Sequence, residues 1–123
     1  GSQAHFENAV NGQNVIYFDT DRYNIDSADA AALQTQAQYL ARYPQINITI
    51  EGHCDERGTR EYNLALGFRR AQSVQEYLVA RGVSGLRLKT RSYGKERPVE
   101  ICSSERCYEK NRRTMTILTQ SLS

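Results

Sequence analysis

The chain of 123 residues is poor in several features that would mark particular classes of protein. It has no tryptophan and only two prolines, and no apolar run approaches the roughly 18 residues of a membrane-spanning helix. Its net charge is only +2, with acidic and basic residues interleaved. Because nucleic-acid binding needs a concentrated basic surface, this charge does not indicate a nucleic-acid partner. The eight tyrosines form no ordered stacking platform for bases either.

Motifs for metal, phosphate or hydrolytic chemistry are also missing. The sequence has no glycine-rich phosphate loop and no His-Glu-x-x-His pattern. His53 has no cysteine–histidine cluster around it, so we expect a structural role for it rather than metal binding. Asp55 and Glu56 are adjacent, and because neighbouring side chains diverge they do not form a catalytic pair. We therefore expect no enzymatic activity, no metal and no cofactor.

The pairing of the three cysteines indicates whether the protein occupies an oxidising or a reducing compartment. Cys102 and Cys107 lack the Cys-x-x-Cys redox spacing and have no nearby histidine for zinc. Their spacing favours a short-range disulfide in an oxidising compartment; two free thiols in a reducing cell are the alternative. Cys54 is left over. Because no Ser/His/Asp-type set of partners accompanies it, we expect a small buried thiol rather than a nucleophile.

The length fits one domain. Residues 1–13 are polar and aperiodic, and we expect a flexible arm that starts with a tag remnant, Gly1-Ser2. Residues 14–119 would form the domain, and residues 120–123 a C-terminal tail. The apolar fraction of 39% is low but sufficient for a modest core.

Two helices are expected in this domain. Asp26 or Ser27 would cap the first, because a side-chain oxygen there can accept the free N–H groups of the first turn, and Pro44 would end it. The second helix would run from about residue 62 to residue 81. Its core seam would be formed by Leu64, Gly67, Ala71, Val74 and Leu78, with Gly82 just beyond its C-terminus.

Strict alternation marks one strand. Ile46, Ile48 and Ile50 point one way and the polar residues between them the other, which predicts one buried and one solvent-exposed face. The other expected strands are residues 14–18, 86–93 and 113–118. The strand 86–93 is the more polar, so we expect it nearer an edge of the sheet. One helical turn is expected within residues 94–112. The order β-α-β-α-β-(α)-β predicts a two-layer α+β domain with its helices on one face of the sheet.

The most distinctive segment runs from Gly52 to Asn63 and is followed by Arg69-Arg70-Ala71. Asp55 follows the end of a strand. Arg70 lies on the next helix, and its guanidinium is free to reach the loop that carries Asp55. One interpretation is an ion pair that pins the loop. The other is that each residue binds a ligand, with the planar guanidinium taking a carboxylate through two parallel hydrogen bonds and Asp55 taking an ammonium.

Five separated segments carry a resemblance to a known family. They are Tyr17 to Asp21, Glu51 to Asn63, Leu66 to Ala71, Ser92 to Pro98 and Asn111 to Arg113. In this order they resemble the OmpA-like C-terminal peptidoglycan-binding domains, over roughly Val15 to Leu118. The runs Glu56 to Thr59 and Tyr93 to Glu96 resemble the peptidoglycan-associated lipoproteins within that family more than its porin-linked or flagellar-stator members. The resemblance implies an OmpA-like fold with a mixed four-stranded sheet.

The resemblance also implies a ligand, the diaminopimelate residue in the peptide stem of peptidoglycan. It assigns Asp55 and Arg70 to the diaminopimelate and Asn63 to the same site. The rim after the first strand corresponds to Asp19 and Thr20. The expected ligand-binding set is completed by Glu56 and Leu66. Cys54 departs from the family, which usually has alanine there.

The partners implied by the resemblance are peptidoglycan and a TolB-like periplasmic protein. The chain would face the periplasm from the outer membrane, held by an N-terminal lipid anchor that these residues do not include. It would serve the Tol–Pal system in envelope integrity and cell division. Three alternatives remain open: a module that mainly docks a protein, a porin- or stator-linked wall anchor, and a peptidoglycan amidase or thiol hydrolase that uses Cys54.

Overall fold

The computed structural model describes residues 2–119. The expected tail, residues 120–123, and Gly1 lie outside the described residues. Five helical segments and four strands follow one another as α1 (Gln3–Ala9), β1 (Val15–Tyr17), α2 (Ser27–Arg42), β2 (Asn47–His53), α3 (Arg60–Ala80), a 3-10 turn η1 (Gly85–Arg87), β3 (Leu88–Gly94), α4 (Glu105–Asn111) and β4 (Arg113–Thr119).

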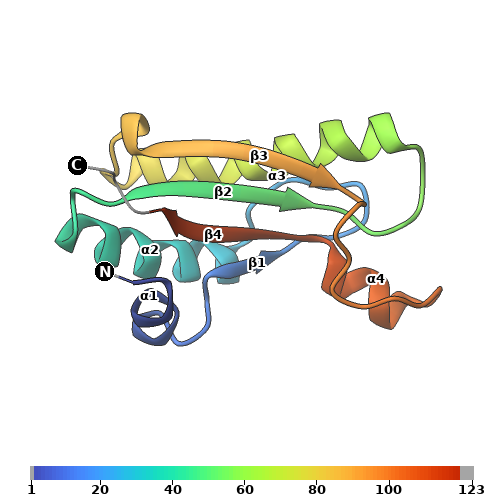
Figure 1. The fold of residues 1–123 in the computed structure, drawn as a ribbon, viewed down its shortest axis with the longest axis horizontal. Coiled ribbons are helices and arrows are strands. Elements are labelled where there is room, and N and C mark those ends of the chain that lie inside the picture. The colour runs from blue at the N-terminus through green and yellow to red at the C-terminus, as the bar shows by residue number, and fades with distance from the viewer. Residues whose placement is uncertain (1, 120–123) are drawn as a thin grey trace.

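The four strands form one mixed sheet in the order β1-β4-β2-β3 (Figure 1). β2 and β3 run parallel, joined by the crossover helix α3, and β4 lies antiparallel to both β2 and β1. The α+β fold, the mixed sheet and the edge position of the strand after the second helix are confirmed.

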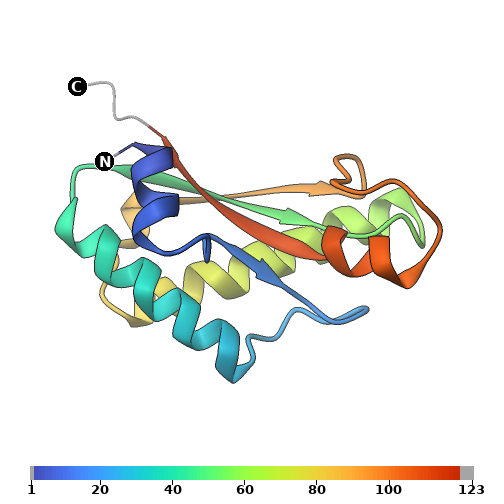
Figure 2. The same cartoon turned by 90° about the horizontal axis from the view of Figure 1, so that it is seen from below.

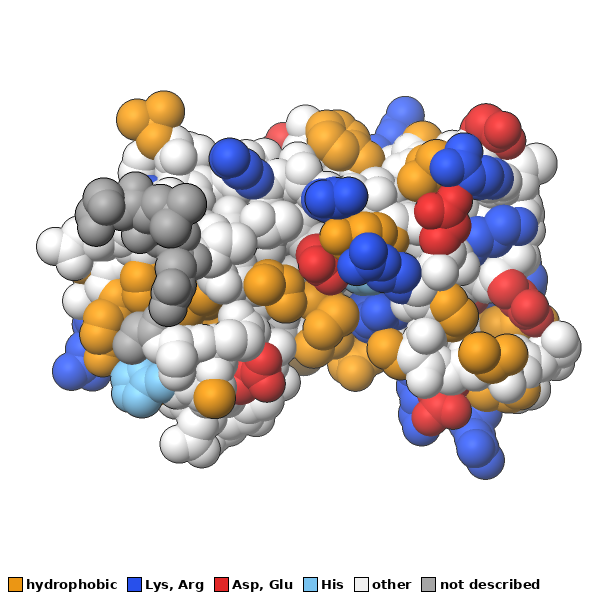
Figure 3. Space-filling model, in the orientation of Figure 1, with side chains coloured by type: hydrophobic (Ala, Val, Ile, Leu, Met, Phe, Trp, Pro, Cys, Tyr) orange, Lys and Arg blue, Asp and Glu red, His pale blue; other side chains and the backbone are white. Residues whose placement is uncertain are grey.

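α2 and α3 lie side by side under one face of the sheet (Figure 2). Between these layers the core is built from apolar side chains that the periodicity predicts, among them Leu33 and Leu40 of α2, Ile48 and Ile50 of β2 and Val74 and Leu78 of α3. The opposite face of the sheet stays open, and Figure 3 shows basic side chains there interspersed with apolar and acidic ones. Among residues 2–119, none of the helices has the length and apolar character needed to cross a membrane.

The helix boundaries follow from local capping. The Asp26 carboxylate accepts the N–H of Asp29 at 2.8 Å, so α2 starts as expected. α3 starts earlier than expected, at Arg60, because Thr59 Oγ1 accepts the N–H of Tyr62 at 3.1 Å. Gly82 has φ +99° just after α3, a conformation that glycine adopts without strain.

The expected core seam of α3 is partly wrong. Ala71, Val74 and Leu78 are buried as expected, but Leu64 is only half-buried. Leu66 and Arg70 are buried instead. The first turns of α3 therefore turn a different face toward the sheet than the expected seam. That face carries polar and charged side chains, which lie under the end of β2.

Residues 3–9 form a helix, so the expected flexible arm is wrong for this part of the chain. Ser2 caps α1 by accepting the N–H of His5 at 3.1 Å. Phe6 and the C-cap residue Val10 are buried in the core cluster, and the Phe6 ring centroid lies 5.0 Å from that of Tyr39. The packed unit thus begins well before residue 14.

α1 also completes the edge of β4. β1 pairs with β4 only as far as Met115. Beyond that point the Gln3 side-chain amide donates to Thr116 O at 3.2 Å and accepts the N–H of Leu118 at 2.7 Å. These bonds satisfy backbone groups that a short edge strand would leave open.

One close backbone contact sets the position of α3 over β2. An added Cβ on Gly52 would lie 1.7 Å from Gly67 O, so the two backbones touch where only glycine fits. Leu66 and Arg70 lie next to this contact on α3. Their side chains are therefore held over the C-terminal end of β2.

Gly52→Ala is expected to destabilise the domain by about 3 kcal/mol or more, because the methyl group must push the α3 backbone away from β2. Gly85→Ala is the matched control, since its added methyl would meet only a Val79 methyl at an ordinary 3.8 Å. We expect the control to stay within about 0.5 kcal/mol of wild type. Chemical denaturation of both variants measures the difference, and equal unfolding free energies would contradict the close contact.

Candidate functional site

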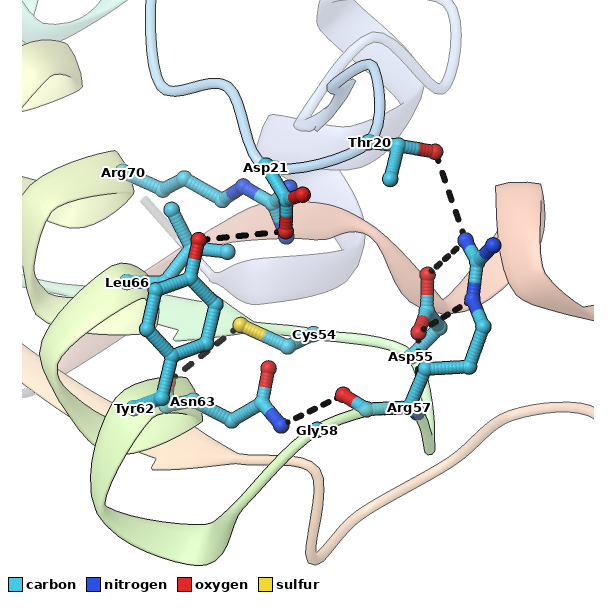
Figure 4. A pocket seen from close by; sticks show the side chains of 10 residues that line it. All are labelled: Thr20, Asp21, Cys54, Asp55, Arg57, Gly58, Tyr62, Asn63, Leu66 and Arg70. Carbon is cyan, nitrogen blue, oxygen red and sulfur yellow. Dashed lines mark hydrogen bonds and ion pairs between the residues drawn. The ribbon is translucent and has the colours of Figure 1, made fainter.

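A pocket of about 260 Å³ lies at the C-terminal end of β2, between the loop after β2, the start of α3 and the loop after β1 (Figure 4). Its lining mixes acidic, basic, neutral polar and apolar side chains. The residues are Thr20, Asp21, Cys54, Asp55, Arg57, Gly58, Tyr62, Asn63, Leu66 and Arg70. The pocket therefore offers charges of both signs to one small ligand.

Arg70 is the largest fully buried side chain of the described residues. Its guanidinium donates to three backbone carbonyls: Nε to Arg22 O at 2.8 Å, Nη1 to His53 O at 2.9 Å and Nη2 to Asp19 O at 3.0 Å. Burial lowers the pKa of Arg70, but an arginine stays protonated in proteins. Arg70 thus fixes a positive charge at the pocket and joins the loop after β1 to the end of β2. Further N–H groups remain on both Nη atoms.

Asp55 is also buried, but its partner is Arg57 rather than Arg70. Asp55 Oδ1 accepts the Arg57 backbone N–H at 3.0 Å and Nε at 3.1 Å, and Oδ2 accepts Nη2 at 2.7 Å. Arg112 Nη1 lies 3.6 Å from the same Oδ2. Burial alone would raise the pKa of Asp55, but the bonds from Arg57 and the charges of Arg57 and Arg112 hold it below its ordinary value. Asp55 is therefore a carboxylate at neutral pH.

The first interpretation, an Asp55–Arg70 ion pair that pins the loop, is thus not realised within residues 2–119, where Asp55 lies beside Arg57 and Arg112 instead. The two charges face the pocket from different elements, which fits the interpretation in which each binds a ligand. Arg57 was not among the ligand-binding residues expected from the sequence. Its position follows from the turn in which Asp55 accepts the backbone N–H of Arg57, because the arginine side chain then runs back along the carboxylate.

Asn63 closes the floor of the pocket. Its side-chain amide donates to Arg57 O at 2.8 Å and to Thr59 O at 2.9 Å, which holds the loop, and its Oδ1 points into the pocket (Figure 4). Gly58 has φ +91° in this loop, a left-handed backbone conformation that favours glycine. Asn63 therefore shapes the pocket as well as lining it.

Cys54 lines the pocket with a buried thiol that donates to Asn63 O at 3.3 Å. Burial raises the pKa of this thiol to about 11, so it is protonated at neutral pH. The structure thus agrees with a small buried thiol and disfavours a nucleophile.

Two side-chain bridges connect the pocket walls to the loop after β1. Tyr62 OH donates to Asp21 Oδ1 at 3.1 Å on one side, and Arg57 Nη2 donates to Thr20 Oγ1 at 3.3 Å on the other (Figure 4). Asp21 has φ +57°, a left-handed conformation that aspartate tolerates better than most residues. Tyr62 was not singled out from the sequence.

The structure brings together most of the expected ligand-binding set. Asp55, Asn63, Leu66, Arg70 and Thr20 line the pocket. Asp19 and Glu56 do not. Asp19 offers only its backbone carbonyl to Arg70, and its side chain lies on a neighbouring cavity. Glu56 turns outward to the segment just before α4, where Ser103 Oγ donates to it at 2.9 Å.

His53 lies beneath the site, buried at the end of β2. Its Nε2 is 3.2 Å from Glu51 Oε1, its ring stacks on Tyr93 and its Nδ1 is without a hydrogen-bond partner in the described structure. Burial, followed by the charges of Arg113 and Arg97, lowers the pKa of His53 to about 3. The contact with Glu51 is therefore a hydrogen bond from a neutral imidazole, not an ion pair.

The lowered pKa of His53 predicts a pH-dependent stability. The unfolded chain binds this proton below about pH 6.5 and the folded chain only below about pH 3, so stability is present above pH 6.5 and is lost as pH falls through that window. Chemical denaturation should show wild type losing about 1.4 kcal/mol per pH unit relative to His53→Asn. Equal slopes for wild type and His53→Asn would contradict the buried neutral imidazole.

Cys102 and Cys107 are joined by a disulfide, with their Cα atoms 5.8 Å apart. Residues 2–119 contain no group of three or more His, Cys, Asp or Glu side chains placed to hold a metal ion. The chemistry that the pocket can offer is therefore fixed charge, hydrogen bonds and one apolar wall.

The family model of the OmpA family matches residues 17–112, which include every residue that lines the pocket. The chain belongs to the OmpA family. This confirms the resemblance drawn from the five sequence segments.

Relatives within the OmpA family are similar over nearly the whole chain. A peptidoglycan-associated lipoprotein of Rhizobium meliloti (strain 1021) is 56% identical over 96% of this chain, and a peptidoglycan-associated lipoprotein of Pasteurella multocida (strain Pm70) is 44% identical over 83% of it. The chain spans 66% of the length of the Rhizobium meliloti protein and 68% of that from Pasteurella multocida.

Solved structures of other proteins share the fold. The peptidoglycan-associated lipoprotein from Burkholderia pseudomallei superposes with a TM-score of 0.88 at 41% identity, covering 92% of this chain and 96% of that chain. The C-terminal domain of Helicobacter pylori MotB superposes with a TM-score of 0.81 at 21% identity, covering 88% and 85%. The second likeness concerns the fold alone.

Proposed function

We propose that the domain binds peptidoglycan non-covalently, by holding a diaminopimelate residue of the peptide stem in the pocket at the end of β2. The observation that carries this proposal is the pair of buried, opposite charges, Asp55 and Arg70, which line one pocket without neutralising each other. The relatives named as peptidoglycan-associated lipoproteins support the choice of polymer.

The chemistry of diaminopimelate matches this pocket. The end of its side chain carries an ammonium and a carboxylate on one carbon. Arg70 has unused N–H groups on both Nη atoms for the carboxylate. The ligand ammonium would bind the carboxylate of Asp55, which also accepts a hydrogen bond from Arg57. Leu66 would cover the methylene chain of the ligand.

The same pocket would discriminate against lysine in the stem. A lysine side chain ends in an ammonium alone, which would leave the buried Arg70 without its ligand partner. A hydrogen bond to a charged group is worth about 1.5–3 kcal/mol. Diaminopimelate should therefore bind about ten- to a hundredfold more tightly than lysine.

The proposed function is binding without catalysis. Hydrolysis by Cys54 would need a thiolate, but burial raises the pKa of this thiol to about 11. Asp55 and Arg70 are held by neighbouring groups as fixed charges, which suits recognition rather than proton transfer.

The cellular role extends this proposal. The names of the relatives support a lipid anchor in the outer membrane, facing the periplasm, so that the domain tethers that membrane to the wall within the Tol–Pal system. A TolB-like periplasmic protein would dock on the same face and compete with the wall. Exposed Tyr23 and Tyr62, which line a second hollow beside the pocket, favour such a docking surface.

Co-sedimentation with purified sacculi tests the proposal. Wild type should pellet with diaminopimelate-type sacculi and remain mostly in the supernatant with lysine-type sacculi. Asp55→Ala and Arg70→Ala should both lose binding, whereas the exposed control Glu61→Ala should keep it. If both pocket variants pellet like wild type, the proposed site is wrong.

A further inference from the structure

The disulfide-closed turn Cys102–Cys107 and α4 lie at the same end of the sheet as the start of α3 (Figures 1 and 2). We call residues 102–108 the brace. The brace does not line the pocket, yet its side chains contact residues on the outer side of the loop that carries Asp55.

The first of these contacts holds Glu56. Ser103 Oγ and Tyr108 OH both donate to Glu56 Oε1, at 2.9 and 3.1 Å. Glu56 directly follows Asp55 in the chain. The hydrogen bonds that hold the Glu56 side chain on the brace therefore also restrain the backbone at Asp55. The outward direction of Glu56, which excludes it from the pocket, is thereby explained.

The second contact holds Arg57. The Arg57 guanidinium lies over the Tyr108 ring, 4.4 Å from its centroid, while its Nη2 donates to Asp55 Oδ2 at 2.7 Å. The ring keeps the half-exposed arginine on the outer side of Asp55. The orientation of the Asp55 carboxylate thus depends on where Tyr108 places Arg57.

The third contact holds Arg112, which follows α4. Arg112 Nη2 donates to Glu105 Oε1 at 2.8 Å and its Nε to Phe18 O at 2.7 Å. These bonds direct the remaining Nη1 toward Asp55 Oδ2, 3.6 Å away. Both cations beside Asp55 therefore contact the brace, Arg57 through Tyr108 and Arg112 through Glu105.

The disulfide is the covalent restraint on the brace. α4 has only seven residues, and its N-cap residue Ser104 makes no side-chain capping bond. So short a helix has little stability of its own. Cys107 is buried, and its bond to Cys102 closes the turn from which Ser103 and Glu105 project.

We propose that the brace is a positioning element of the pocket: the Cys102–Cys107 disulfide holds Ser103, Glu105 and Tyr108 so that Arg57 and Arg112 orient Asp55 toward its ligand. Opening the disulfide leaves the domain folded but weakens binding. The ligand part rests on the proposed function. The orientation of Asp55 can be measured without any ligand.

The binding test uses the tripeptide L-Ala-γ-D-Glu-meso-diaminopimelate and calorimetric titration. Cys102→Ser/Cys107→Ser should bind about tenfold more weakly than wild type while remaining folded. Tyr108→Phe, which removes only the hydroxyl, should bind about two- to threefold more weakly. Tyr77→Phe is the matched control, because Tyr77 also lies under an arginine but at the far end of α3, and it should bind like wild type.

Chemical reduction of the Cys102–Cys107 disulfide tests the same prediction independently of the serine variant. Dithiothreitol supplies two electrons and two protons, which convert the disulfide to two thiols, and is itself oxidised to its cyclic disulfide. Reduced wild type should bind as weakly as the double serine variant. The double serine variant should not respond to the reductant.

The ligand-free readout is the pKa of Asp55, followed by NMR of its carboxyl carbon. It should rise toward its ordinary value when the disulfide is removed, because Arg57 and Arg112 are then less well placed. An unchanged Asp55 pKa in the folded double variant overturns the proposal whatever the ligand does. If the pKa rises but wild type does not bind the tripeptide, the positioning role stands and the proposed function fails.

Discussion

Arg70→Met is expected to destabilise the domain by about 4 kcal/mol or more and to abolish tripeptide binding. Met fills the buried space but donates no hydrogen bond to the carbonyls of Asp19, Arg22 and His53. Each buried acceptor left without its donor costs about 1–3 kcal/mol. Chemical denaturation gives the stability and calorimetry the affinity.

Arg70→Lys should fall between wild type and Arg70→Met, because one ammonium cannot reproduce a planar fork that reaches carbonyls in two chain segments. The adjacent Arg69→Lys is the matched control. Arg69 is exposed and lies over the ring of Tyr23, so this change should alter the unfolding free energy by less than about 0.5 kcal/mol. Equal stabilities for Arg69→Lys and Arg70→Lys would show that the three carbonyl bonds contribute little.

Asp55→Asn is expected to lower tripeptide affinity by about a hundredfold or more while the fold is retained. The amide keeps the size of the carboxylate but removes the charge that holds the ligand ammonium, Arg57 and Arg112. Removing one partner of a buried, hydrogen-bonded charge pair typically costs about 2–5 kcal/mol of binding free energy. Glu61→Gln, an exposed carboxylate in the first turn of α3, is the control and should bind like wild type.

The stability difference between wild type and Asp55→Asn should also depend on pH. The folded-state pKa of Asp55 is lowered, so its contribution is present above the unfolded value of about 3.9 and is lost as pH falls through the folded value. Denaturation at about pH 6 should therefore show the full difference, and at about pH 3 a smaller one. A difference that grows on acidification would contradict the lowered pKa.

Much of the fold could be predicted because its signals are local. The alternation of Ile48 and Ile50, the cap at Asp26 and the glycine after α3 each follow from short-range chemistry. α1 was missed because its polar residues hide a short apolar face. The spacing of Phe6 and Val10 behind a serine cap was the available signal.

The site was predicted in outline but not in its electrostatics. Asp55 and Arg70 could be found as a charged pair near a strand end, but the burial of Arg70 depends on the Gly52–Gly67 contact, which is tertiary. The role of Arg57 depends on a turn and on Tyr108, which lies far along the chain. Asp19 and Glu56 were placed in the pocket because sequence proximity does not reveal which way a loop side chain turns.

The most direct test of the proposed function is a calorimetric comparison of two tripeptides that differ only in their third residue, meso-diaminopimelate or L-lysine. Wild type should bind the diaminopimelate peptide about ten- to a hundredfold more tightly, and Asp55→Asn should lose most of the affinity. Equal affinity of wild type for the two peptides, or no binding of either, would contradict a pocket built for an ammonium and a carboxylate on one carbon.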